Sequence, residues 1–295
     1  MIKPTLHCLQ QANAILGESP LWHPKQNALY WADILRPAVY RLVPGVGQTG
    51  QWPMPSAVGA IGFCNNNELI VALEHEGICR FNPQTAALRV ICDPVKICGP
   101  KDVPGRYNDG RVDPLGNFWV GWLSHSRRQA GALFRVEPSG MVHRVLDNLT
   151  APNGLGWSGD GKTLYITDSH INTIWAYACD LETGQLGARR ALIKQDKKLG
   201  IFDGLCVDSD GNIWTALYAG GAVLQLSPEG QVRARMGLPV DLVTSCCFGG
   251  ERLRSLLITT AVRGQSAADL LAQPLAGSVF TVETRSTGLP EAMTG

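Results

Sequence analysis

Residues 153–167 read NGLGWSGDGKTLYIT, and residues 203–217 read DGLCVDSDGNIWTAL. In both stretches a short apolar segment runs into a turn rich in Gly, Asp, Asn or Ser, and a second short apolar segment follows. Glycine in such turns supplies the positive φ angles that tight hairpins require. Each stretch therefore predicts a β-hairpin, and the two hairpins are copies of one unit.

Copies of this unit occur six times along the 295 residues. Intervals of 40 to 49 residues separate the expected starts of their second strands, which are Leu29, Leu69, Phe118, Leu164, Ile213 and Leu256. Repeats of this length with several strands each are typical of propeller blades. A single blade cannot bury its faces alone, so blades must pack side by side in a closed body. The pattern predicts an all-β, six-bladed β-propeller, one domain that spans residues 1–295.

The two ends of the sequence are expected to behave differently. The run from Leu6 to Leu16 precedes the first repeat and has no hairpin partner of its own. We expect this N-terminal strand to join the last blade beside residues 277–282 and so close the ring. A helical pattern occurs only around residues 267–272, and the polar tail after Thr284 is expected to be loosely held.

The composition narrows the possible functions. The net charge of +1 gives no field that would attract nucleic acid or an anionic membrane surface. No run approaches the length of a membrane-spanning helix, and the N-terminus lacks a signal-peptide core. The nine cysteines form no C-x-x-C pair, which favours reduced thiols over disulfides or a zinc site. We therefore expect a cytoplasmic protein; the sequence indicates no oligomeric state.

Oxygen-bearing side chains recur at one point of the repeat. The residues ten or eleven positions before four of the strand starts are Glu18, Asn108, Asn153 and Asp203. Equivalent positions of a radial repeat lie at one height around the axis, so these groups should converge. Glu18, Asn153 and Asp203 offer oxygen ligands with two formal negative charges, which suits one divalent cation such as calcium, magnesium, manganese or zinc. The alternative is that Asn-Gly and Asp-Gly merely form turns.

Two further groups of residues are candidates for the site or the core. Arg106 lies two residues before Asn108, and in an extended strand both side chains point to the same side. Arg106 could then bind a polyol or a carboxylate beside the metal; the alternative is a surface arginine in a turn. We interpret the recurring tryptophans as packing between blades rather than as sugar platforms: Trp22, Trp119, Trp157 and Trp214.

Motifs of competing enzyme classes are missing from the sequence. It has no G-x-S-x-G elbow of a serine hydrolase, no P-loop and no dinucleotide fingerprint. The Gly-His and Trp-Asp signature of WD40 repeats is also missing. The chemistry is therefore expected to depend on the oxygen-bearing residues of the repeat.

The motifs around these residues resemble the SMP-30/gluconolactonase (regucalcin) family, and the resemblance covers nearly the whole chain. They are GESPLW at 17–22, RYNDGRVD at 106–113, NGL at 153–155, DGLCVD at 203–208, LPVD at 238–241 and TSCCFGG at 244–250. The resemblance implies a six-bladed propeller with one divalent metal in its channel and hydrolysis of sugar lactones. It places metal ligands on Glu18, Asn153 and Asp203, and substrate contacts on Arg106 and Asn108.

One segment departs from the family pattern. The lactonases that the chain resembles often carry an acidic residue just after the inner strands of blade three. Here that segment, residues 123–128, reads LSHSRR. Recognition of the distal hydroxyl groups of the sugar is therefore expected to differ.

These observations predict a metal-dependent hydrolase whose partner is a small-molecule sugar lactone. The metal would polarise the lactone carbonyl, and either Asp203 as the catalytic base or a metal-bound hydroxide would provide the attacking water. Two alternatives stay open: a non-catalytic regulatory protein that binds calcium or another divalent metal, and a hydrolase of other esters or phosphotriesters.

Overall fold

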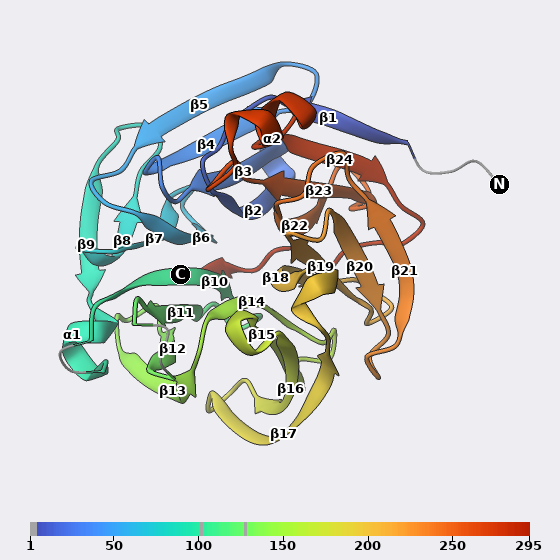
Figure 1. Ribbon diagram of the computed structural model, residues 1–295. Helices are drawn as coiled ribbons and strands as arrows, with labels where there is room; N and C mark the ends of the chain where they lie inside the picture. Colours follow the sequence, from blue (N-terminus) through green and yellow to red (C-terminus); the bar gives the residue numbers. More distant parts are fainter. Residues whose placement is uncertain (1–4, 101–102, 127–128) are drawn as a thin grey trace.

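Six antiparallel sheets are arranged around a central axis (Figure 1). The computed structural model describes residues 5–100, 103–126 and 129–295, and each sheet in this part of the chain contains four antiparallel strands, to which the sheet of blade two adds a short parallel strand at its inner edge. The first strand of each blade lies nearest the axis, and the last strand lies at the outer edge. The six strand starts expected from the sequence all fall within one residue of an observed second-strand start. The predicted six-bladed propeller is confirmed.

The strands follow the repeat of the sequence. The first three blades are formed by β2 (Gly17–His23), β3 (Ala28–Asp33), β4 (Ala38–Val43) and β5 (Gly47–Pro53), then β6 (Val58–Cys64), β7 (Leu69–Leu73), β8 (Gly77–Phe81) and β9 (Leu88–Cys92), then β10 (Gly105–Val112), β11 (Phe118–Ser124), β12 (Gly131–Val136) and β13 (Val142–Leu149). The next two are formed by β14 (Pro152–Trp157), β15 (Thr163–Asp168), β16 (Thr173–Asp180) and β17 (Gln185–Lys194), then β18 (Ile201–Val207), β19 (Ile213–Tyr218), β20 (Ala222–Leu226) and β21 (Val232–Gly237).

The sixth blade closes the ring as the sequence predicts. It combines β22 (Val243–Gly249), β23 (Ser255–Thr260) and β24 (Val279–Glu283) with the N-terminal β1 (Leu6–Gln10). β1 pairs with β24 in antiparallel register, with Leu6 opposite Val282. A strand from the start of the sequence therefore completes the blade formed at its end.

Helices in the described residues are few and short. They are α1 (Pro94–Cys98), α2 (Ala267–Ala272) and the 3₁₀ turns η1 (Pro24–Gln26), η2 (Ser169–Ile171) and η3 (Lys197–Leu199). α2 occupies the residues where the sequence shows a helical pattern, and a capping box between Ser266 and Asp269 fixes its start. None of these helices has the length and apolar character needed to cross a membrane.

The hydrophobic core lies between blades rather than inside them. Six clusters of buried side chains each join two neighbouring blades, and the cluster between blades six and one completes the circle. Trp119 and Trp157 meet edge to face at 5.7 Å between blades three and four, and Trp214 meets Phe248 in the same way between blades five and six. The predicted inter-blade role of the tryptophans is confirmed. Every cysteine in the described residues is a free thiol.

The expectation of a loose C-terminal tail is wrong. Residues 284–295, the C-terminal strap, cross beneath the centre of the ring to reach blade two (Figure 1). The backbone N–H of Ser209 donates to the carbonyl of Thr287, and β25 (Met293–Thr294) pairs in parallel with β6. Polar residues alone suggested mobility, but their backbone groups are hydrogen-bonded to blades on opposite sides of the ring.

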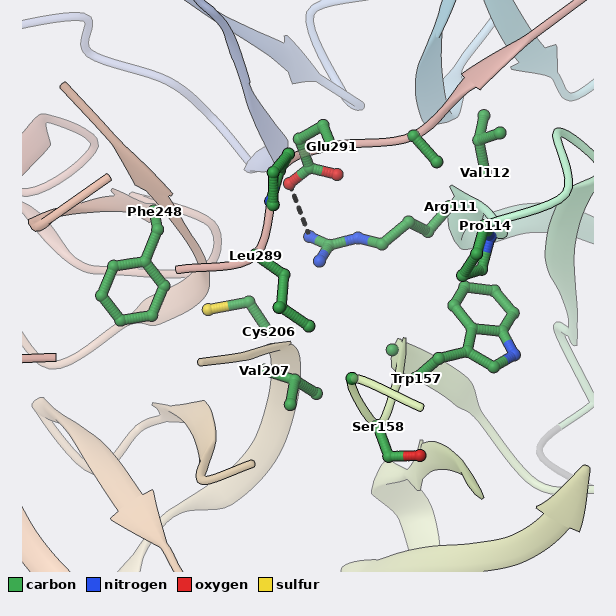
Figure 2. Close-up of a pocket in the computed structure, with 14 residues that line it drawn as sticks. Arg111, Val112, Pro114, Trp157, Ser158, Cys206, Val207, Phe248, Leu289 and Glu291 are labelled. Carbon is green, nitrogen blue, oxygen red and sulfur yellow. Dashed lines mark ion pairs between the residues drawn. The ribbon is translucent and has the colours of Figure 1, made fainter. Parts of the chain in front are cut away.

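A buried ion pair attaches the strap to the centre of the ring. Figure 2 shows Arg111 of β10 reaching toward Glu291 of the strap, with Leu289 and Cys206 nearby. Arg111 Nη2 lies 3.8 Å from Glu291 Oε1, and the two side chains are 16% and 10% exposed. They border a pocket of about 220 Å³ lined by the final residues of several inner strands. The strap therefore covers one end of the central channel.

We expect Glu291→Gln to lower the free energy of unfolding by about 3 kcal/mol, because it leaves the buried Arg111 charge unpaired. Urea unfolding followed by tryptophan fluorescence measures this loss. Adding Arg111→Met should restore part of it, since the isolated buried charge is then removed. Glu251→Gln, at an exposed glutamate, is the control and should change stability by less than about 0.5 kcal/mol. Equal stabilities of Glu291→Gln and wild type would contradict a structural role for the pair.

Candidate metal and substrate site

The predicted site residues lie together at the end of the channel opposite the strap. All stand in the first half of an inner strand: Glu18 in β2, Arg106 and Asn108 in β10, Asn153 in β14 and Asp203 in β18. Glu18, Asn108 and Asp203 are each 6% exposed, and Asn153 is half-buried. Beyond the effect of burial, the charge of Asp203 raises the pKa of Glu18, and the charge of Arg106 lowers the pKa of both carboxyl groups. Residues far apart in the sequence thus share one small volume.

A β-bulge at each position turns these side chains toward the axis. In all six inner strands of the described chain, the pairing with the second strand shifts by one residue. In the four blades that carry site residues, the shift lies between Glu18 and Leu21, Tyr107 and Gly110, Pro152 and Leu155, and Phe202 and Leu205. Such bulges re-aim side chains and are frequent beside functional sites. Residue types alone do not predict these bulges.

The glycines that follow Asn153 and Asp203 are there because neighbouring strands approach closely. A Cβ on Gly154 would overlap the backbone nitrogen of Leu205, and a Cβ on Gly204 would overlap the side chain of Ser245. Both residues lie within strands and neither has a positive φ. The Asn-Gly and Asp-Gly pairs are therefore not turns here, which removes the alternative reading of this pattern.

Three of these inner strands are held in place at their starts by hydrogen bonds from the backbone to buried polar side chains. These side chains lie at the ends of second strands or in the turns that follow. The Asp33 carboxylate accepts from the N–H groups of Ile15 and Leu16 at 2.8 and 3.0 Å, just before Glu18. The Asp168 carboxylate accepts from the N–H of Ala151 at 2.7 Å, just before Asn153. The side-chain oxygen of Asn172, Oδ1, accepts from the N–H of Phe202 at 2.8 Å. These clamps were not foreseen, although Asp33 and Asp168 occupy equivalent places in their repeats.

Two buried oxygen atoms in the site have no hydrogen-bond partner. Asn153 Nδ2 donates to Ser169 Oγ at 3.2 Å, which leaves Asn153 Oδ1 unpaired, and Asp203 Oδ1 is also unpaired. Glu18 Oε2 accepts only a long bond of 3.3 Å from its neighbour Ser19. Buried polar atoms are normally satisfied, so unpaired ones call for a ligand. Carboxylate and amide oxygens of this kind fit a hard divalent cation.

The donor set is neither a histidine nor a cysteine site. In the part of the chain that the structure describes, no group of three or more His, Cys, Asp or Glu side chains could hold a metal ion. The set is two carboxylates and one amide, so the third ligand would be the Asn153 carbonyl oxygen. Oxygen donors without sulfur or imidazole suit calcium, magnesium or manganese best.

Arg106 and Asn108 form one unit beside this set. Arg106 Nη1 donates to Asn108 Oδ1 at 2.6 Å and to the carbonyl of Tyr107 at 3.0 Å. Asn108 Nδ2 donates to the carbonyl of Pro152 at 2.8 Å, in the next blade. Asn108 therefore holds the guanidinium in place and is itself held by blade four. The remaining N–H groups of Arg106 are available to a bound molecule.

The acidic groups of the site raise one another's pKa. Burial raises the pKa of Glu18, and the neighbouring Asp203 and Asp109 raise it further. Burial likewise raises the pKa of Asp203, as does Asp109, whereas Arg106 and the Asn153 amide act in the opposite direction. Burial is also the main reason that the pKa of Asp109 rises to about 6. A bound dication would relieve this repulsion.

Comparisons with known proteins agree with the fold. The chain is 33% identical over 284 residues to regucalcin of Gallus gallus, covering 94% of this chain and 93% of the relative. It is 36% identical over 292 residues to 6-deoxy-6-sulfogluconolactonase of Pseudomonas putida, covering 98% of each. The crystal structure of a calcium-binding protein, regucalcin, from Agrobacterium tumefaciens matches with a TM-score of 0.91 at 25% identity, covering 98% of this chain and 96% of that one.

A six-bladed propeller with acidic and amide oxygens from three blades at one end of its channel defines the class of protein. Residues 16–262 match the SMP-30/Gluconolactonase/LRE-like region. The chain belongs to this family, as its sequence motifs predict. Of the segment that departs from the family pattern, Arg127 and Arg128 lie outside the described residues.

We expect Gly154→Ala to lower the free energy of unfolding by about 3 kcal/mol, because the new methyl group meets backbone that cannot move aside cheaply. Gly159→Ala is the matched control in the same blade, since a Cβ there meets nothing within 4 Å and its φ is ordinary. Chemical unfolding of both variants measures the difference. Equal stabilities would show that close approach of the inner strands does not require Gly154.

We expect Asp203→Asn to raise the melting temperature of the metal-free protein by a few degrees at about pH 8. A carboxyl with a raised pKa binds more protons when folded, so wild type loses stability as pH rises from about 4 through the raised value. Asparagine removes this loss, and the difference should vanish toward about pH 4. Thermal unfolding in chelator across this range tests it, with Asp210→Asn, an exposed residue of the same blade, as control. A variant less stable at about pH 8 would refute the electrostatic account.

Proposed function

We propose that this protein hydrolyses a sugar lactone to the aldonic acid, with one divalent cation held by Glu18, Asn153 and Asp203. The observation that carries the proposal is the pair of buried, unpaired oxygens, Asn153 Oδ1 and Asp203 Oδ1, beside the Glu18 carboxylate. Burying such atoms without a partner is costly, so their arrangement is best explained by a ligand that binds oxygen. The family membership supports the same reaction.

The names of related proteins point to the substrate class. The Pseudomonas putida relative is a 6-deoxy-6-sulfogluconolactonase, and a gluconolactonase of Xanthomonas campestris shares the fold with a TM-score of 0.76. Both names describe hydrolysis of a cyclic ester of a sugar acid. The single cation and the polar Arg106–Asn108 unit of this chain suit a substrate with one carbonyl and several hydroxyl groups.

The chain's own residues would divide the chemistry as follows. A bound cation supplies Lewis acidity, which draws charge from the lactone carbonyl. The Arg106 guanidinium, fixed by Asn108, would orient the ring oxygens. Asp203 would accept a proton from the attacking water, and burial favours this role because it raises the pKa of the carboxyl. The water oxygen would bond to the carbonyl carbon, the ring C–O bond would break, and the leaving oxygen would take up the proton that Asp203 accepted from the water.

A second candidate function uses the same site without turnover. The Agrobacterium tumefaciens structure is that of a calcium-binding protein, which favours a binding role for the oxygen set. Such a protein would bind the cation and hydrolyse no lactone. A single experiment separates the two functions.

We expect the purified protein to release acid from at least one five- or six-membered aldonolactone, and a chelator to abolish this activity. Asp203→Asn should lower kcat/KM by about a thousandfold, since it removes both a cation ligand and the proton acceptor. The measurement is acid release in weak buffer with a pH indicator, after treatment with chelator and return of each cation.

Asp210→Asn is the control for this experiment, because it makes the same chemical change at an exposed site of the same blade. It should keep wild-type kcat/KM. Cation binding by calorimetry without turnover of any lactone would instead establish the binding function. Near-normal activity of Asp203→Asn would show that its assigned role is wrong.

A further inference from the structure

Arg263 stands at the corner of a tight turn on the same end of the ring as the site. The N–H of Gln265 donates to the carbonyl of Val262 at 3.1 Å, and Gly264 between them has a φ of +74°. A positive φ at the third position of a turn requires glycine or a similarly tolerant residue. Arg263 thus occupies the second position of a defined turn, and its side chain is exposed.

Hydrogen bonds fix this turn beside the strand that carries Glu18. The N–H of Arg263 donates to the carbonyl of Ile15 at 3.0 Å, and Ala261 forms a bridge with Leu16. The buried Asp33 carboxylate in turn holds the N–H groups of Ile15 and Leu16. The backbone of Arg263 is therefore held against Ile15, which lies three residues before Glu18 in the sequence.

The charge of Arg263 reaches the site. Burial lowers the pKa of Arg106, Glu18 raises it, and the nearby positive charge of Arg263 lowers it again. Burial raises the pKa of Tyr218, the charge of Arg263 lowers it, and the charges of Asp203 and Glu18 raise it. The charges of two guanidinium groups, one from blade three and one from the turn after β23, thus act on the same site.

Neither guanidinium has an acidic partner in the described residues. The hydrogen bonds of Arg106 end on the neutral oxygens of Tyr107 and Asn108, and the guanidinium of Arg263 makes no hydrogen bond or ion pair. The carboxylates whose charges reach Arg106 are Glu18, Glu74 and Asp203, all beyond ion-pair distance. A cation bound by Glu18 and Asp203 would neutralise two of these, which leaves one carboxylate, Glu74, near two guanidinium groups.

The end of β11 in blade three carries no acid that would repel an anion. At the end of β11, residues 123–126 contain no acidic side chain. The buried Ser124 hydroxyl shares a hydrogen bond of 2.7 Å with Ser126. This segment is therefore neutral where resembling lactonases often carry an acid.

We propose that Arg263, together with Arg106, selects lactones that carry an anionic substituent at the carbon farthest from the carbonyl. The group would be a sulfonate, a phosphate or a carboxylate, because a guanidinium binds each of these through two parallel hydrogen bonds. The inference rests on the proposed lactonase function and specifies its substrate class. Since the anion takes no part in the bonds that form and break, its contact with Arg263 acts mainly on KM.

The test compares gluconolactone with its 6-sulfo, 6-phospho and 6-carboxy counterparts, using the full chain loaded with a divalent cation. We expect wild-type kcat/KM for at least one anionic lactone to exceed that for gluconolactone by about tenfold. Arg263→Gln should remove this preference through a higher KM and leave gluconolactone turnover unchanged. Arg263→Lys should retain part of it, because the charge remains but the paired geometry is lost.

Arg252→Gln is the matched control, since Arg252 is exposed in the loop between β22 and β23 at the opposite end of the blade. It removes the same charge and should leave every kinetic constant unchanged. Turnover of gluconolactone with no preference for any anionic lactone, or a preference that survives Arg263→Gln, overturns this inference and leaves the proposed function intact. No turnover of any lactone by wild type overturns both. The three anionic lactones also identify which anion the arginines bind.

Discussion

Close packing of the inner strands around the axis is the constraint on which the site depends. Where blade five approaches blade four, no atom larger than hydrogen fits on Gly154, and the same holds for Gly204 against blade six. The bulge at each of these positions places an extra residue in the strand, and that residue is turned inward. Asn153 and Asp203 therefore face the axis as a result of how the blades fit together.

The same packing determines the electrostatics of the site. The inner strands exclude water from Glu18 and Asp203, so the two carboxyl groups face one another with little screening. Such an arrangement lowers the stability of the fold, and the six inter-blade cores offset the loss. Proteins commonly retain local destabilisation where they bind or react, because the same groups are strongly attracted to the ligand.

The sequence predicted the features that recur and missed those that depend on distant partners. Glu18, Asn153 and Asp203 could be found because a repeat shows where equivalent positions lie. The bulges and the Asp33 and Asp168 clamps repeat as well, but pairing register cannot be read from residue types alone. The strap was expected to be loose because its residues are polar, and nothing in the local sequence shows that Arg111 of another blade reaches Glu291. Arg263 lies in a loop, and because the loops differ in sequence from blade to blade, the repeat does not indicate its role.

The pairing of β1 with β24 also bears on how the protein folds. In each of the other blades the four antiparallel strands are adjacent in the sequence, so their hairpins can form locally and quickly. Leu6 and Val282 must instead meet from opposite ends of the chain, at a large cost in loop entropy. Until they do, both strands present open edges, the kind of surface through which β proteins aggregate. Closure of the sixth blade should therefore be the slow step, and the stage at which a nascent chain most needs protection.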